Sequence, residues 1–464
     1  MNRTFTNLTS LVGADTAGRL LGLVAVAFLA RTVGAEALGL LAAGMGILTY
    51  GTIVAEAGLP MLGTRKVARD MSAPQALIRQ VCITRAALAS GVFILCGAAL
   101  FLTLNTASLR NLIIVYLLAL FPSVFVIEWV FQGLKKITVL AGGRIITAFT
   151  YLLWLVLFVR QDSSLLLVPV GWITSVIAQA IYLWKQLETT DQQESQAGVS
   201  SSELLKTAWP LGLAGLIAQT VIQFPAVYLG VTDPYAGGLF NIAFRVIVLM
   251  LVVDRVFYTL FFPAITSVLK SNPSGLSVYF SRTMKLMVFA TVYIAVAAVV
   301  SSRHILPFLF GNDFVESTVI FQLLTLYFVC SVINSVCTFT LIGAEREKVY
   351  LNSLMLGGAG FFGIMLLPGP VPSSHLAAMG LVIFQLISFL VMLREIQAFI
   401  QFPVGRIIFL PIVSGLAVMT VLAQLYSLFP LFSLILAITA TPIILYFVAG
   451  ISPEDRTYAM RALS

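Results

Sequence analysis

Long apolar segments recur along the whole chain, and they restrict its fold more than any other feature. Each is close to the roughly 20 residues that a helix needs to cross a bilayer. Only 10% of the 464 residues are charged, whereas a soluble domain carries roughly 25%. The sequence therefore predicts an all-α polytopic membrane protein with about fourteen transmembrane helices. The predicted helices are residues 8–30, 38–62, 80–104, 111–133, 138–159, 165–184, 207–230, 238–262, 282–300, 317–342, 349–367, 376–393, 407–425 and 431–450.

The basic residues are unevenly distributed over the loops between these segments. With the N-terminus placed in the cytoplasm, 18 lysines and arginines fall on the cytoplasmic side, with Arg282 and Lys285 at the cytoplasmic start of the segment 282–300 among them. Another 4 fall in outer loops, and the other 5 of the 27 lie deeper within the segments. Cytoplasmic loops of membrane proteins are enriched in these residues. We therefore expect both termini to be cytoplasmic. A miscounted helix would scramble this bias in every loop after the error.

Several classes of site are disfavoured by what the sequence lacks. All 4 cysteines lie in apolar segments and only 2 histidines are present, so we expect neither a disulfide framework nor a metal site. No phosphate-binding G-x-x-x-x-G-K-[ST] loop occurs. The basic residues are spread over short loops, which argues against a nucleic-acid partner. We predict that the protein is not an enzyme and uses no cofactor.

A polar segment divides the chain. Residues 185–206, KQLETTDQQESQAGVSSSELLK, are rich in Ser and Gln and lack aromatic residues, which is typical of a flexible linker. On either side of it, Gly39-Leu40 and Gly238-Leu239 each open a helix after a short outward turn. Parallel repeats with a site between the halves are a transporter architecture. We predict two six-helix lobes around a central cavity, with an N-terminal lobe over 1–184, a cytoplasmic linker over 185–206, a second lobe over 207–393, and an extra transmembrane pair with a cytoplasmic tail over 394–464.

Ionisable side chains within the predicted helices are candidates for a functional site. A charge at a helix centre costs about 2.5–3.5 kcal/mol on insertion scales, so such residues face protein or a water-filled cavity. The planar arginine side chain suits phosphate recognition, whereas embedded carboxylates suit a coupling proton or sodium ion. We predict that Arg19, Arg245 and Arg255 face the headgroup or phosphate of a substrate, and that Asp15, Glu56 and Asp254 hold a coupling ion or form ion pairs. We predict no catalytic and no metal-ligating residue.

A purely structural role is the alternative for these charges. Asp15 and Arg19 are four residues apart on one helix face, so they can pair with each other. Asp254 and Arg255 are adjacent and point about 100° apart, so for them the alternative is an ion pair with neighbouring helices. Arg245 is near enough to the outer end of its helix to reach the interface.

Three further charges lie near the predicted cytoplasmic ends of helices. Arg85 and Arg144 are within a turn or two of these ends, and we expect them to extend to the lipid headgroups. Glu128 opens the segment EWVFQGLKK, and we expect it to face water.

Four segments resemble those of a known family. They are LARTVGAEALGLLAAG (29–44), EWVFQGLKKI (128–137), LPFLFGNDF (306–314) and GAEREKVYLN (343–352). Together with the hydropathy pattern, they are similar to the polysaccharide-transport branch of the multidrug, oligosaccharidyl-lipid and polysaccharide exporter superfamily. This branch includes the bacterial O-antigen flippases.

The resemblance implies a function as well as a fold. It implies a flippase of the bacterial inner membrane that moves oligosaccharide units of O-antigen, capsule or exopolysaccharide, carried on undecaprenyl diphosphate. The sugar and the diphosphate pass through the cavity while the lipid tail stays in the bilayer, and transport is driven by a proton or sodium gradient. The implied partners are the lipid-linked oligosaccharide, membrane lipid, the coupling ion, and a polysaccharide polymerase with a chain-length regulator.

Two other functions remain open on the sequence alone. An ion-coupled multidrug exporter of the same superfamily usually has twelve helices and an acidic cavity, so fourteen helices and buried arginines argue against it. A membrane polysaccharide polymerase normally needs a long extramembrane loop, and no loop here exceeds about twenty residues.

Overall fold

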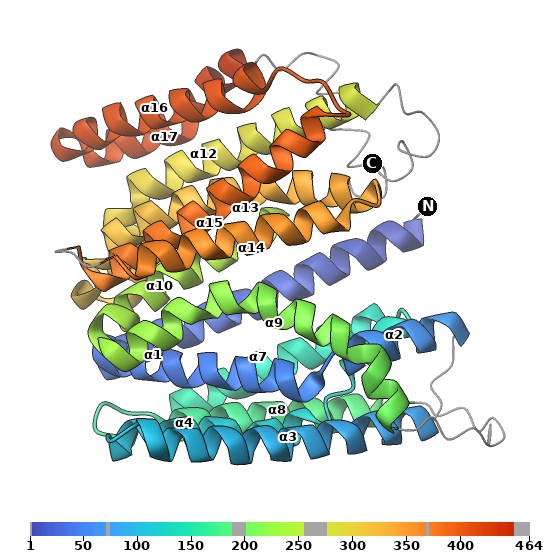
Figure 1. The fold of residues 1–464 in the computed structure, drawn as a ribbon. Coiled ribbons are helices and arrows are strands. Elements are labelled where there is room, and N and C mark those ends of the chain that lie inside the picture. The colour runs from blue at the N-terminus through green and yellow to red at the C-terminus, as the bar shows by residue number, and fades with distance from the viewer. Residues whose placement is uncertain (1, 71–74, 188–200, 255–275, 368–370, 450–464) are drawn as a thin grey trace. The chain divides into compact units, whose positions relative to one another are not determined.

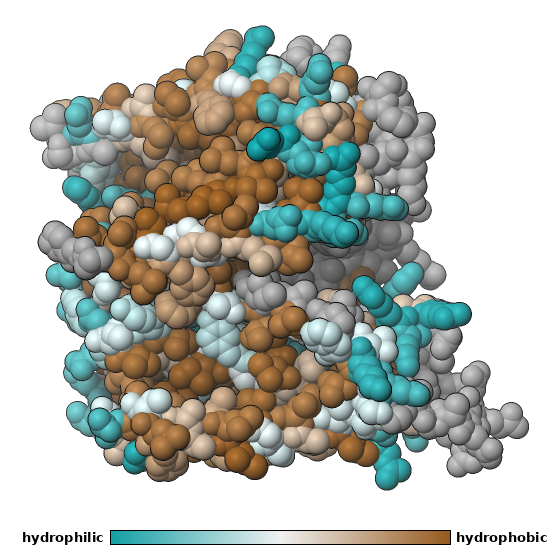
Figure 2. All heavy atoms as spheres, in the orientation of Figure 1, coloured by the Kyte–Doolittle hydropathy of each residue, from teal (hydrophilic) through white to brown (hydrophobic). Residues whose placement is uncertain are grey.

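The computed structural model describes residues 2–70, 75–187, 201–254, 276–367 and 371–449. Over these residues the regular structure is helical throughout, which confirms the predicted fold class of a polytopic α-helical membrane protein (Figure 1). Nine helices in the described part are long and apolar enough to cross a membrane, and shorter apolar helices cover 107–123 and 435–448. Each predicted segment contains helical backbone. Figure 2 shows apolar side chains along the helices and hydrophilic ones at their ends.

The chain forms two compact units, residues 1–241 and 242–464. The first unit contains most of the helices that are discussed below. They are α1 (Asn2–Glu56), α2 (Leu59–Asp70), α3 (Gln75–Thr103), α4 (Ala107–Leu118), α5 (Leu120–Ser123), α6 (Glu128–Gly133), α7 (Ile137–Phe158), α8 (Leu167–Lys185), α9 (Ser201–Thr232) and the first residues of α10 (Pro234–Met250).

The second unit continues from α10 to the end of the described chain. Its elements are α12 (Leu276–Phe310), the short 3-10 helix η2 (Asn312–Phe314), α13 (Ser317–Gly343), α14 (Glu347–Met365), α15 (Ser373–Gln397), the π-helical turn η3 (Gly405–Phe409), α16 (Leu410–Leu428) and α17 (Pro430–Ala449). Within this unit α15 packs against α13 and α14, and α16 and α17 pack against α12.

Backbone turns locate the ends of the first two predicted spans. Gly34 has φ 78° and ψ 179° inside α1, a conformation that side chains with a Cβ rarely adopt, and it divides α1 where the sequence predicts a turn over 31–37. After the C-terminal end of α1, Ala57 and Gly58 have positive φ angles of 45° and 77°. The second span therefore ends at Glu56, earlier than the predicted residue 62, and α2 starts as a separate helix.

The predicted continuous helix over 111–133 is wrong. Here the chain forms α4, the single turn α5 and the short helix α6. Pro122 explains the first break, because its ring clashes with the carbonyl four residues earlier, at Leu118, where α4 ends. Residues 124–127 then lie between helices, and the carbonyl groups of Val124 and Val126 accept hydrogen bonds from a side chain of another helix.

The predicted linker over 185–206 is helical at its end, because α9 begins at Ser201. α9 packs against α1 and α2 within the first unit. One hydrogen bond in this packing runs from the Tyr50 hydroxyl to the Thr220 carbonyl oxygen, at 2.9 Å. The division into two six-helix lobes and a linker stays a prediction.

Candidate functional site

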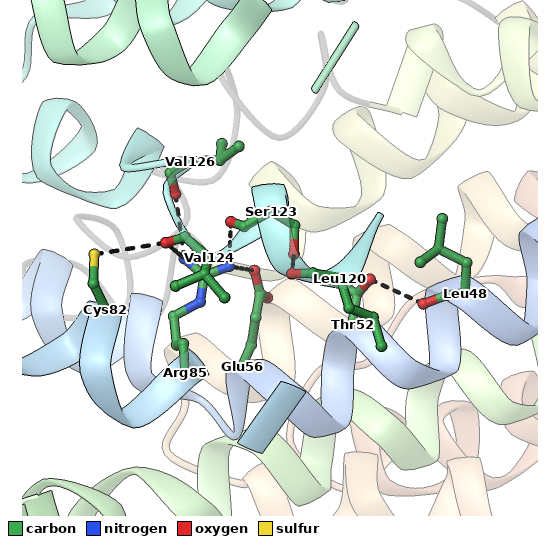
Figure 3. A network of polar contacts seen from close by, with 9 residues as sticks. All are labelled: Leu48, Thr52, Glu56, Cys82, Arg85, Leu120, Ser123, Val124 and Val126. Carbon is green, nitrogen blue, oxygen red and sulfur yellow. Dashed lines mark hydrogen bonds and ion pairs between the residues drawn. The ribbon is translucent and has the colours of Figure 1, made fainter. Parts of the chain in front are cut away.

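An ion pair inside the first unit joins the end of α1 to α3. Arg85 Nη2 donates to Glu56 Oε1 at 2.9 Å, and the Arg85 side chain is only 3% exposed (Figure 3). The same guanidinium donates to three backbone carbonyls, those of Ser123 at 3.0 Å, Val124 at 3.3 Å and Val126 at 3.2 Å. One arginine therefore ties three parts of the chain together: α1, α3 and the segment after α5.

The break after α5 explains why an arginine is stable at this depth. Carbonyls at a helix end have no intrahelical partner, and a cation at that end is also favoured by the helix dipole. Cys82, one turn before Arg85 on α3, donates its thiol to the Val124 oxygen at 3.6 Å. Arginine carries five N–H donors in a fixed plane, so a single side chain satisfies the carbonyls and the carboxylate together.

The partner carboxylate is more accessible than the arginine. The Glu56 side chain is 35% exposed, against 3% for Arg85. Glu56 ends α1 and is followed directly by the turn at Ala57 and Gly58. The carboxylate is thus fixed on one side by Arg85 and open on the other, an arrangement that can take up a proton or a small cation.

A second polar cluster lies on α6, α7 and α8. Arg144 Nη2 lies 3.1 Å from Glu128 Oε2, with side chains 32% and 22% exposed, respectively. Gln179 Nε2 on α8 donates to Glu128 Oε1 at 2.6 Å. Each oxygen of the Glu128 carboxylate thus has a partner on a different helix. The negative charges of Glu128 and Glu56 repel each other, so the two clusters influence each other electrostatically.

These contacts correct one expectation and add a partner to two other residues. Arg85 does not extend to the headgroups, because its side chain is buried and turned towards Glu56 and the broken helix. Arg144 and Glu128 bind each other. The signal that could have located the network was Pro122, which predicts a helix break and free carbonyls at a depth where only a buried donor can satisfy them.

The six predicted site residues do not form one cluster in the described part of the structure. In the first unit, Glu56 contacts Arg85, whereas Arg19 is half-buried on α1. In the second unit, Arg245 is exposed on α10. The side chain of Asp15 and the whole of Arg255 lie outside the described residues. Their predicted roles therefore remain predictions.

The sixth residue, Asp254, belongs to a polar network in the second unit. The Ser335 side chain on α13 lies near its carboxylate. On the same helix, Asn334 Nδ2 donates to the backbone carbonyl of Gln385 on α15 at 2.8 Å and to its side-chain oxygen. The Tyr327 hydroxyl lies near the Gln385 side chain. Tyr327, Asn334 and Ser335 follow helical spacing, and this polar face of α13 was the sequence signal that our prediction missed.

No group of three or more potential metal ligands of the His, Cys, Asp or Glu type occurs among the described residues. The charged groups instead form pairs and small networks inside the helical bundle. Such groups are costly in a membrane and mark either ion and substrate pathways or ties between helices.

Comparison with known proteins gives one family match. The sequence profile of the family described as "Polysaccharide biosynthesis protein" matches residues 5–269, more than half of the chain. No curated protein matches the chain significantly.

Solved structures share the fold at low sequence identity. The lipid II flippase MurJ in an inward closed conformation superposes with a TM-score of 0.73 at 15% identity, over 94% of this chain and 98% of that one. An inward-facing multidrug resistance MATE family transporter of the MOP superfamily superposes with a TM-score of 0.63 at 14% identity, over 82% of this chain and 95% of that one. A MOP superfamily transporter from Pyrococcus furiosus superposes with a TM-score of 0.57 at 14% identity, over 85% of this chain and 95% of that one. The fold is therefore that of polytopic membrane transporters.

Proposed function

This chain belongs to the polysaccharide biosynthesis protein family, and we propose that it is a flippase for oligosaccharide units carried on undecaprenyl diphosphate. The family match carries this proposal. The fold supports it, because one of the solved structures that share it is named a lipid II flippase and so moves a lipid-linked molecule. The substrate would be a repeat unit of O-antigen, capsule or exopolysaccharide, moved across the bacterial inner membrane.

The mechanism that we propose is alternating access driven by an ion gradient. Arg19, Arg245 and Arg255 would bind the diphosphate or the headgroup, because a guanidinium is suited to phosphate oxygens. Asp15, Glu56 and Asp254 would bind the coupling proton or sodium ion. Of these, Glu56 is the best supported, since its carboxylate is held by a buried arginine and still 35% exposed.

The bias of basic residues supports an inner-membrane protein with both termini in the cytoplasm. A polysaccharide polymerase and a chain-length regulator would act on the transported unit at the outer face. A cysteine introduced near either terminus tests this topology: a membrane-impermeant maleimide should label it in inverted membrane vesicles and leave it unlabelled in intact cells.

Deletion of the gene in a strain without a second copy of this function tests the proposal. We expect loss of surface polysaccharide and accumulation of the lipid-linked unit at the cytoplasmic face, both reversed by the wild-type chain. Normal surface polysaccharide in the deletion strain would overturn the proposal.

A multidrug exporter is the second candidate, and the shared fold of the MATE transporter favours it. The same deletion strain discriminates between the two, because loss of an exporter increases drug sensitivity and leaves surface glycan intact. A polymerase defect would instead shorten the glycan chains while single repeat units still reach the surface.

A further inference from the structure

A surface cavity of about 400 Å³, open to its surroundings, lies between α2 and the beginning of α9. Its lining comes from both helices: Leu62, Lys66, Glu203, Leu204, Lys206 and Thr207. The side chain of Leu204 is buried, that of Lys66 is half-buried, and Lys206 and Glu203 are exposed. The cavity therefore has an apolar base and a rim with two positive charges and one negative charge.

Separate contacts hold each wall of this cavity. α2 is fixed against α6, because a Cβ on Gly63 would lie 2.4 Å from the Trp129 ring and Thr64 Oγ1 donates to the Trp129 carbonyl at 3.1 Å. The start of α9 is fixed against α3, where Thr84 Oγ1 donates to Ser201 Oγ at 3.0 Å. Because both walls are anchored to other helices, the backbone positions that carry the two lysines are fixed within the first unit.

The cavity lies where apolar helices end. α2 follows the turn that ends the α1 span at Glu56. The cavity residues of α9 directly precede the apolar sequence that starts at Ala208. In Figure 1, α2 and the beginning of α9 lie at the same end of the helices. Two large apolar side chains close in sequence to the lining residues are exposed, Met61 at 51% and Trp209 at 54%. Tryptophan beside lysine is typical of the lipid–water interface.

We propose that this cavity binds the headgroup of an anionic phospholipid, with the phosphate between Lys66 and Lys206 and the acyl chains along Met61 and Trp209. Lysine binds phosphate as a point charge, and the Thr207 hydroxyl offers a further donor at the rim. The two lysines and Glu203 leave one net positive charge, which matches the single negative charge of a phosphodiester. A diphosphate ester carries more charge and would meet the Glu203 carboxylate, so the cavity favours the phospholipid over a lipid-linked substrate. This site goes beyond the proposed transport function and does not depend on it.

Native mass spectrometry of the purified full chain tests the proposal. The probes are phosphatidylglycerol and phosphatidylcholine with identical acyl chains, added to delipidated protein in detergent. We expect the wild-type chain to retain one equivalent of phosphatidylglycerol in preference to phosphatidylcholine. The double variant Lys66→Gln/Lys206→Gln should lose this preference, by about fivefold for each lysine, which is the ratio expected for a lysine near an anionic lipid surface.

A matched control separates the site from total charge. Lys185→Gln/Lys348→Gln removes two exposed lysines outside the cavity and should bind phosphatidylglycerol as the wild type does. A third variant, Glu203→Gln, should bind it more tightly, a gain that a folding defect cannot produce.

Three results would overturn the proposal. They are equal retention of the two phospholipids by the wild type, equal loss of binding in the cavity and control variants, and displacement of phosphatidylglycerol by an equimolar amount of undecaprenyl diphosphate. The last result would assign the cavity to a diphosphate lipid. Each of these measurements uses purified protein and leaves the proposed transport function untouched.

Discussion

Gly39 on α1 and Gly238 on α10 each pack against the residue that lies four positions before the other. A Cβ added to Gly39 would lie 1.8 Å from the carbonyl oxygen of Pro234, and a Cβ added to Gly238 would lie 1.9 Å from the carbonyl oxygen of Ala35. Such reciprocal contacts are expected where two related segments meet across a twofold axis. The sequence aligns these same two Gly-Leu pairs as the clearest trace of an internal repeat.

Replacing Gly39 with alanine should therefore destabilise the protein. The added methyl group meets backbone atoms, which cannot rotate away as a side chain can, and overpacking of this kind costs typically 1–3 kcal/mol. Thermal unfolding in detergent, followed by intrinsic fluorescence or by loss of the monodisperse peak, measures the effect. We expect a lower unfolding temperature for Gly39→Ala and a similar decrease for Gly238→Ala.

Gly22→Ala is the matched control for this prediction. Gly22 lies on the same helix, and a Cβ there would have no neighbour within 4 Å. Alanine is a better helix former than glycine by up to about 1 kcal/mol, so this variant should be unchanged or slightly more stable. If Gly39→Ala and Gly22→Ala unfold at the same temperature, the close contact does not exist in the protein.

Removing the guanidinium of Arg85 should be among the most damaging single changes in the first unit. Arg85→Gln removes the guanidinium that donates to Glu56 and to three carbonyls, of which that of Val126 has no other donor among the described residues. Breaking a buried pair costs about 3–5 kcal/mol. We expect little folded protein in membranes and a strongly reduced unfolding temperature. Glu56→Gln should be milder, because this side chain is 35% exposed and Arg85 keeps its carbonyl partners.

The comparison of these two variants tests how the network is built. If both variants lose the same amount of stability, Arg85 stabilises the protein mainly through its ion pair with Glu56 and not through the carbonyls of the broken helix. Folded Glu56→Gln protein that fails to transport would support a role for this carboxylate in coupling.

Glu128→Gln should destabilise the protein less than Arg85→Gln. Its partner Arg144 has a side chain that is 32% exposed, so the freed guanidinium reaches water more readily than that of Arg85. A hydrogen bond to a charged group contributes about 1.5–3 kcal/mol, and the Gln179 contact is partly retained by the amide. Unfolding temperatures measured side by side check this order, and a Glu128→Gln variant less stable than Arg85→Gln would contradict it.

Charge removal at Arg19 or Arg255 should reduce translocation more than it reduces the amount of folded protein. The reason is the proposed contact between these guanidinium groups and the substrate phosphate. The measurement compares surface polysaccharide with the quantity of folded protein in membranes for Arg19→Gln, Arg255→Gln and the control Arg160→Gln, which removes an exposed arginine. If activity falls only in proportion to folded protein, these arginines have a structural role.

How far the sequence predicts the site depends on the residue. It singled out Glu56 as an embedded carboxylate but placed its partner Arg85 at the headgroups, since distance from a helix end gives depth and not the direction of a side chain. For the same reason, the sequence analysis singled out Glu128 but did not predict its partners Arg144 and Gln179. The buried Asn334 and Gln385 contact went unrecognised because neither side chain is charged.

The sequence by itself determined the membrane class, the approximate places of most helices and the family resemblance. These depend on local properties, since a long apolar segment that faces lipid can satisfy its backbone polar groups only by forming a helix. Only the tertiary structure decided that Arg85 meets Glu56 and the carbonyls freed by Pro122. Such partners come from helices that are distant in sequence, and the rotation of each helix about its axis is set by packing against its neighbours.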